Sequence, residues 1–236
     1  MRSTSETGYG ARVGNAEKLV AALQNFNNYQ AIKPEYSINS YTGLINTTKA
    51  QNTTVAGKKQ SYSLAVDNRI QIFEKRELAI DKVLSAINGT VKVSFGRTSK
   101  EATDVAAIIA KIRGANIRKS KSTNPDDQTV SQSFQSFNSK AQFFSDLIVY
   151  LTNFGQNYQP ANAALKIAGL NEIYTDAIAA NSNVMDTFTQ FAQSNTTRID
   201  GYFELSQTAI RIKDSVKAQY GYNSTEYSLI KGLRIW

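Results

Sequence analysis

The 236-residue sequence contains no cysteine and no histidine. A chain without these residues forms no disulfide, thiolate nucleophile, Cys/His zinc site or imidazole-based acid–base triad. Cysteine and histidine carry a large share of enzyme chemistry. Without them, catalysis could use only carboxylate or lysine side chains. We therefore expect a protein that is not an enzyme, with no catalytic residue, cofactor or metal site.

Long apolar runs are also missing. No segment approaches the roughly 18 to 20 apolar residues of a membrane span, and the first residues, Met1 to Gly8, lack the apolar stretch of a signal peptide. With 41% hydrophobic residues, 19% charged residues and only 3 prolines, the composition is that of a globular protein. We expect a cytoplasmic protein without a membrane span.

The net charge of +8 is unevenly distributed. Residues 1–125 contain 19 Lys and Arg against 9 Asp and Glu, a balance of +10, whereas the remainder has 8 against 10, a balance of −2. Two interpretations stay open. The asymmetry results from sequence drift after a duplication, or it favours head-to-tail association of copies. Head-to-tail contacts that do not close into a ring form a filament.

The chain repeats itself. Val91–Glu101 and Val216–Glu226 are identical at five of eleven positions. Upstream matches keep the same order, with separations of 126 to 129 residues: Leu23–Phe26 with Leu151–Phe154, Asn28–Gln30 with Asn157–Gln159, Pro34 with Pro160, and Gly43-Leu44 with Gly169-Leu170. An ordered series of this kind predicts an internal duplication.

The clearest repeated motif predicts a helix, a glycine turn and a capped short helix. A glycine with positive φ ends the first helix, and Thr98 and Asn223 have capping-box spacing to the glutamates that follow. We interpret the motif as structural: Phe95, Gly96, Glu101, Tyr220, Gly221 and Glu226.

Apolar residues at helical spacing occur throughout. Seams run through 134–151, 170–191 and 202–216, with a predicted break at Gln193–Thr197. In the first half, 80–91 is the counterpart of the third seam, and 105–112 is the short helix after the glycine turn. Thr47–Tyr62 is more polar, and we predict a helix there because its counterpart is helical. No period-2 pattern indicates a sheet.

The predicted fold is all-α, an elongated, internally duplicated helical bundle with three longer helices plus one short helix per half. Residues 1–114 form the first, basic helical repeat, 115–129 a linker, and 130–236 the second helical repeat.

The sequence contains two clusters of charged residues that are candidate sites. The densest basic cluster, Arg113, Arg118, Lys119 and Lys121, is either a solvated linker or a contact for nucleic acid or another anionic surface. The acidic residues Glu74, Glu77 and Asp81 alternate with basic ones, which is typical of an ordinary charged helix face.

The sequence resembles a family of uncharacterised, internally duplicated helical proteins of Bacteroidota. The similarity lies in the opening Arg2–Gly8, in Asn157–Pro160, in the basic segment after Arg113 and in the ending from Val216 to Leu233. It covers most of the chain, and it implies no activity, ligand or partner.

These patterns favour a non-enzymatic structural or interaction protein, a duplicated helical bundle that self-assembles or scaffolds a protein partner. The expected partner is a second copy, as a homo-oligomer or filament, or another protein. The alternative is binding of nucleic acid or an anionic surface through the basic first half and linker.

Overall fold

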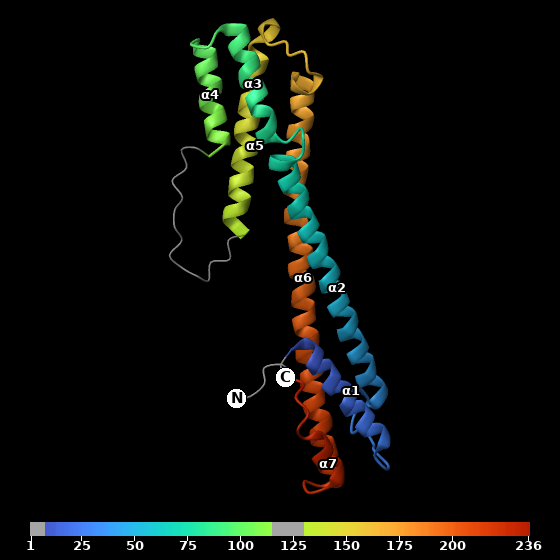
Figure 1. Cartoon of the computed structure of the whole chain (residues 1–236). Coiled ribbons are helices and arrows are strands. Elements are labelled where there is room, and N and C mark those ends of the chain that lie inside the picture. Colours follow the sequence, from blue (N-terminus) through green and yellow to red (C-terminus); the bar gives the residue numbers. More distant parts are fainter. Residues whose placement is uncertain (1–7, 115–129) are drawn as a thin grey trace, which may run out of the picture. The chain divides into compact units, whose positions relative to one another are not determined.

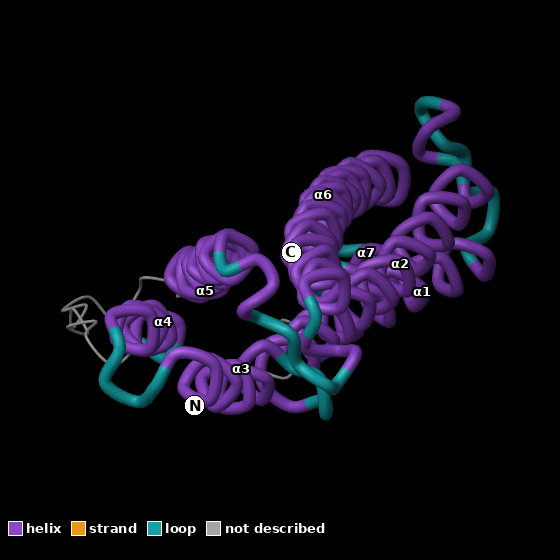
Figure 2. Tube along the Cα trace, turned by 90° about the horizontal axis from the view of Figure 1, so that it is seen from above, coloured by secondary structure: helices purple, strands orange, loops and turns teal. Residues whose placement is uncertain are grey.

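The computed structural model describes residues 8–114 and 130–236, with side chains in the second range from Phe137 onward. Within these ranges the chain forms helices joined by short loops and contains no strand (Figures 1 and 2). The all-α prediction is confirmed. None of the helices in this part of the chain combines the length and hydrophobicity that crossing a membrane requires.

The first half contains four α-helices: α1 (Tyr9–Asn25), α2 (Ile38–Ile70), α3 (Ile80–Phe95) and α4 (Lys100–Ile112). A 3-10 turn, η2 (Pro34–Tyr36), precedes α2, and a π-helical turn, η3 (Gln71–Lys75), follows it. The polar segment Thr47–Tyr62 lies inside α2, as predicted.

The second half contains α5 (Val130–Asn153), α6 (Ile167–Tyr220) and α7 (Thr225–Ile230), with 3-10 turns η4 (Gly155–Asn157) and η5 (Ala163–Leu165) before α6. The predicted break at Gln193–Thr197 is wrong, because α6 continues through it. The hydroxyls of Ser194, Thr196 and Thr197 donate to the carbonyls four residues earlier, so these side chains do not compete with the helical backbone bonds. The second half therefore has two longer helices and one short one.

The helices form two compact units. Unit 1 comprises residues 1–60 and 188–236, and unit 2 comprises 61–187. This partition differs from the predicted repeats, since it separates the ends of the chain from its middle. The predicted repeats, divided at 115–129, were drawn from similarity between segments of the sequence, whereas the two units are defined by spatial compactness. The repeat boundaries therefore stay a prediction.

Each unit has its own apolar core. In unit 1, Leu19 and Leu23 of α1 and Tyr41 of α2 are buried with Leu205 and Ile212 of α6. The core of unit 2 joins the apolar faces of α3 and α4 to those of α5 and the first part of α6. Figures 1 and 2 show α3, α4 and α5 side by side. Both cores thus combine residues from both sides of 115–129.

Hydrogen bonds recur at constant sequence separations. The Tyr29 hydroxyl donates to the Tyr36 carbonyl at 3.1 Å, and 129 residues later Tyr158 donates to the Leu165 carbonyl at 2.9 Å. The same separation relates the backbone turns ending at Ser37 and Lys166.

The separation of 129 residues pairs Gly169 with Ser40, so the sequence pairing of Gly169 with Gly43 is wrong. The space around the two glycines agrees with this correction. A Cβ at Gly169 would lie 2.8 Å from the Ala164 carbonyl oxygen, whereas Gly43 has open space. A repeated glycine–leucine dipeptide was thus a weaker marker of register than the hydrogen-bonded turn before the long helix.

Candidate functional site

The repeated turn motif lies at the ends of α3 and α6. Gly96 and Gly221 both have a φ of 96°, a conformation that glycine adopts without a Cβ penalty. Each glycine N–H donates to the carbonyl four residues earlier, at 3.0 Å. The glycine turn was correctly predicted from the sequence.

The predicted caps are off by one residue. Ser99 and Ser224, not Thr98 and Asn223, are the N-caps of α4 and α7, and their hydroxyls accept from the N–H groups three residues later at 3.1 Å. Only the residue directly before the first helical turn reaches those groups, and the glycine turn extends one residue further than the spacing suggested. The glutamates of the motif lie in the first turns of α4 and α7.

The short helices α4 and α7 each border a hollow. In unit 2, a hollow of about 340 Å³ lies between the start of α4 and the end of α5. It is lined by Lys100, Glu101, Asp104, Tyr150, Asn153 and Phe154. The hollow therefore combines three charged side chains with two aromatic rings.

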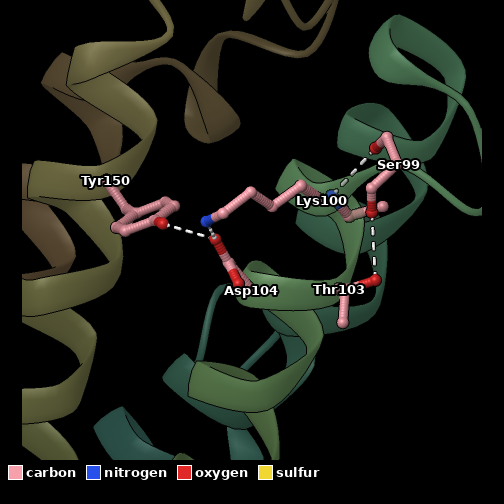
Figure 3. A network of polar contacts seen from close by, with 6 residues as sticks. Ser99, Lys100, Thr103, Asp104 and Tyr150 are labelled. Carbon is pink, nitrogen blue, oxygen red and sulfur yellow. Dashed lines mark hydrogen bonds and ion pairs between the residues drawn. The ribbon is translucent and has the colours of Figure 1, made fainter.

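A polar network occupies one wall of this hollow. The Tyr150 hydroxyl donates to Asp104 Oδ2 at 2.6 Å, and Lys100 Nζ donates to the same oxygen at 2.5 Å. Figure 3 shows Tyr150 reaching from α5 toward Asp104 on α4, with the lysine ammonium beside it. The carboxylate thus links two helices that belong to different halves of the chain.

The electrostatics of the network stabilise its resting charges. Hydrogen bonds from Lys100 and then from Tyr150 lower the pKa of Asp104. The same carboxylate raises the pKa of Lys100 and of the Tyr150 phenol. A general base or nucleophile needs its pKa moved toward neutrality, and here every pKa moves away from it. The arrangement is suited to recognition or bracing.

Comparisons with protein-family models, with curated proteins and with solved structures found no match for this chain. The resemblance to the Bacteroidota family stays a prediction.

Unit 1 has a corresponding hollow of about 470 Å³ between the end of α1 and the start of α7. Asn25, Phe26 and Glu226 occupy the places of Asn153, Phe154 and Glu101. The other positions differ in chemistry, since Leu229 corresponds to Asp104 and Ala22 to Tyr150. The second hollow therefore keeps the shared asparagine, ring and glutamate but has no ionic network.

A second polar cluster in unit 2 surrounds Lys140 of α5. Its ammonium lies 3.2 Å from Glu74 Oε1 and 3.1 Å from Asp81 Oδ2, and the lysine side chain is 18% exposed. Glu74 lies in the π-helical turn and Asp81 lies in the first turn of α3, and residues 76–79 between them belong to neither element. The interpretation of Glu74, Glu77 and Asp81 as one helix face was therefore wrong.

Sequence reasoning missed both clusters for the same reason. Tyr150 is 46 residues from Asp104, and Lys140 is 59 residues from Asp81. No local spacing connects such pairs. For the second cluster a weak signal was Asp81 in the first turn of α3, and that residue type is common at helix starts.

The predicted basic cluster is described only in part. The Arg113 guanidinium donates to the Ser85 hydroxyl at 2.8 Å on the surface of unit 2. Arg118, Lys119 and Lys121 lie outside the described residues. Within the described ranges, no group of three or more acidic side chains is arranged to hold a metal ion.

Unit 1 holds its C-terminal segment with long polar side chains. Arg12 Nε donates to the Ile235 carbonyl at 2.9 Å, and Asn15 Nδ2 donates to the Arg234 carbonyl at 2.7 Å. Lys213 reaches the Leu233 carbonyl, and burial lowers the pKa of its ammonium. Ile235 is fully buried. The segment is therefore an integral part of unit 1.

Proposed function

We propose that this protein is a non-enzymatic interaction protein, built as an internally duplicated helical bundle, that assembles with further copies of itself. The observation that carries the proposal is an apolar face of α6 within unit 1. Ile199, Phe203 and Ile210 are 49%, 66% and 36% exposed. Their spacing of four and seven residues places them on one side of the helix, the pattern of a helix that packs against a partner.

The chemistry of the hollows supports the non-enzymatic part of the proposal. The network around Asp104 stabilises its charged groups in their resting states, and the hollow of unit 1 has no such network. An exposed phenylalanine flanked by other apolar side chains is unfavourable in water, and its burial in an assembly is favourable.

Light scattering coupled to size-exclusion chromatography over a concentration series tests the proposal. We expect a mass that rises with concentration, and Phe203→Ser should abolish the rise. Leu64→Ser is the matched control, because Leu64 is 63% exposed on α2 and lies in unit 2. A monomeric mass at every concentration, or equal effects of the two substitutions, would contradict the proposal.

A second candidate function is binding of nucleic acid or an anionic surface. It is favoured by the charge of unit 1, which has 13 Lys and Arg against 7 Asp and Glu. Retention on nucleic acid or acidic vesicles at low salt should then fall as salt rises. If removing the charges of Arg118, Lys119 and Lys121 leaves retention unchanged, the linker part of this candidate is rejected.

A further inference from the structure

Neither half of the chain contains a complete unit. The core of unit 1 combines residues 13–45 with 202–235, and the core of unit 2 combines 72–112 with 141–180. Polar contacts follow the same division. Tyr41 donates to the Leu205 carbonyl in unit 1, and Arg76 pairs with Asp176 in unit 2. The two halves therefore contact one another as two subunits would.

The contacts between the halves are reciprocal. Phe26 at the end of α1 packs on Tyr220 at the end of α6, with ring centroids 5.8 Å apart. The corresponding pair is Phe154 at the end of α5 on Phe95 at the end of α3, with centroids 4.7 Å apart. The same element of each half thus meets the same element of the other, which is the pattern of an isologous interface.

Residues that differ between the halves favour pairing of unlike halves. With the separation of 125 residues that relates the two glycine turns, Asp81 corresponds to Ser206 and Asp104 to Leu229. If two second halves paired, Lys140 would lose the Asp81 carboxylate and Tyr150 would lose its acceptor. A mostly buried ammonium deprived of a partner is costly, so this pairing is disfavoured.

Charge disfavours the other wrong pairing. Each first half has a balance of +10 through residue 125, so two first halves would repel one another, whereas the second half has a balance of −2. The charge asymmetry thus acts together with the pairs made by Lys140 and Tyr150.

From these contacts we infer that the two halves are complementary partners. The occupant that the interface of either half accepts is the opposite half, from the same chain or from a second copy. This inference does not depend on assembly through the α6 face, because it concerns contacts inside the two units.

The test uses the full chain with a protease site inserted within 115–129. After cleavage, the two fragments should elute together at the mass of the intact chain and separate only in denaturant. Separation in native buffer would overturn the inference. Because the uncleaved chain is measured alongside, failure of its assembly through α6 is distinguished from failure of the halves to stay paired.

Partner choice is tested by mixing cleaved protein from isotopically heavy and light preparations, unfolding it and refolding it. Native mass spectrometry should find pairs of one first half with one second half, with about half of them mixed heavy and light. Pairs of two first halves or of two second halves at comparable abundance would overturn the assignment of the opposite half as the occupant.

A double variant tests which residues determine the pairing of unlike halves. In cleaved protein, Asp81→Ser with Asp104→Leu gives the first half the residues of the second and should weaken pairing about tenfold or more, since two charge-assisted contacts are lost. Arg97→Tyr is the control, because Arg97 corresponds to Tyr222 at the same separation of 125 residues and is exposed. Equal effects of the two would remove these carboxylates from partner choice. Circular dichroism of the uncleaved variants checks that both are folded.

Discussion

The two units connect their helices with different chemistry. In unit 2, charged side chains pair with side chains across helices, as in Lys140 with Asp81 and Tyr150 with Asp104. In unit 1, long side chains more often end on backbone carbonyls, as in Arg12 to Ile235 and Tyr220 to Asn27. A carbonyl is present whatever the residue, whereas a carboxylate is not. If the two halves are complementary partners as we infer, unit 2 should discriminate between partners more strongly than unit 1.

The largest expected effects test whether α1 and α5 have the same role. Leu19→Ala and Leu147→Ala each remove a fully buried side chain at corresponding positions of the two cores. Each should lower the free energy of unfolding by about 2–5 kcal/mol. Hydrogen exchange should place the loss of protection in unit 1 for Leu19→Ala and in unit 2 for Leu147→Ala. Loss in the same unit for both would break the correspondence.

Two glycine substitutions should change the folding stability in opposite directions. Gly169→Ala places a methyl group 2.8 Å from the Ala164 carbonyl oxygen and should cost about 1–3 kcal/mol through overpacking. Gly43→Ala meets open space on α2 and should stabilise the helix by about 0.5–1 kcal/mol. Thermal unfolding of the two variants measures both changes. Equal shifts would show that the two glycines occupy similar surroundings, against the register given by the turns.

The repeated tyrosine bonds should differ in energy because they differ in burial. Tyr158 is 4% exposed, so Tyr158→Phe should cost about 0.5–1.5 kcal/mol, and Tyr29→Phe less because Tyr29 is only half-buried. Denaturant unfolding compares them.

The same tyrosine gives an alkaline prediction. Burial raises the pKa of Tyr158 to about 12 from its ordinary value of 10.0. The contribution of the protonated Tyr158 phenol to folding stability is therefore fully present below pH 10. It is lost as the pH rises toward 12, because the unfolded chain releases this proton first. Tyr158→Phe should flatten this part of the stability profile, and an unchanged profile would contradict the assignment.

The smallest effect concerns the partly exposed Asp104 carboxylate of the unit 2 hollow. The bonds from Lys100 and Tyr150 lower the pKa of Asp104, so its stabilising contribution is present above the ordinary value of 3.8 and is lost as the pH falls through the folded pKa. Lys100→Met should raise the pKa of Asp104 more than Tyr150→Phe does, as measured by NMR titration. The hollow of unit 1 has Leu229 at this place and should show no corresponding titration.

Most helices were predictable because their signal is local. The seam from Ile80 to Val91 predicted a helix, and α3 begins at Ile80 and buries those side chains. The glycine of each repeated turn ends a helix, as predicted. The break predicted at Gln193–Thr197 failed because hydroxyl side chains bonded to the preceding turn are compatible with a helix.

The sequence by itself determined the all-helical class, the glycine turns and a set of ordered internal matches, since each rests on residues a few positions apart. Only the tertiary structure decided which helices share a core and that Asp104 meets Tyr150 and Asp81 meets Lys140. Those contacts join segments from opposite sides of 115–129. Helical periodicity specifies which face of a helix is buried, but it carries no information about which distant face covers it.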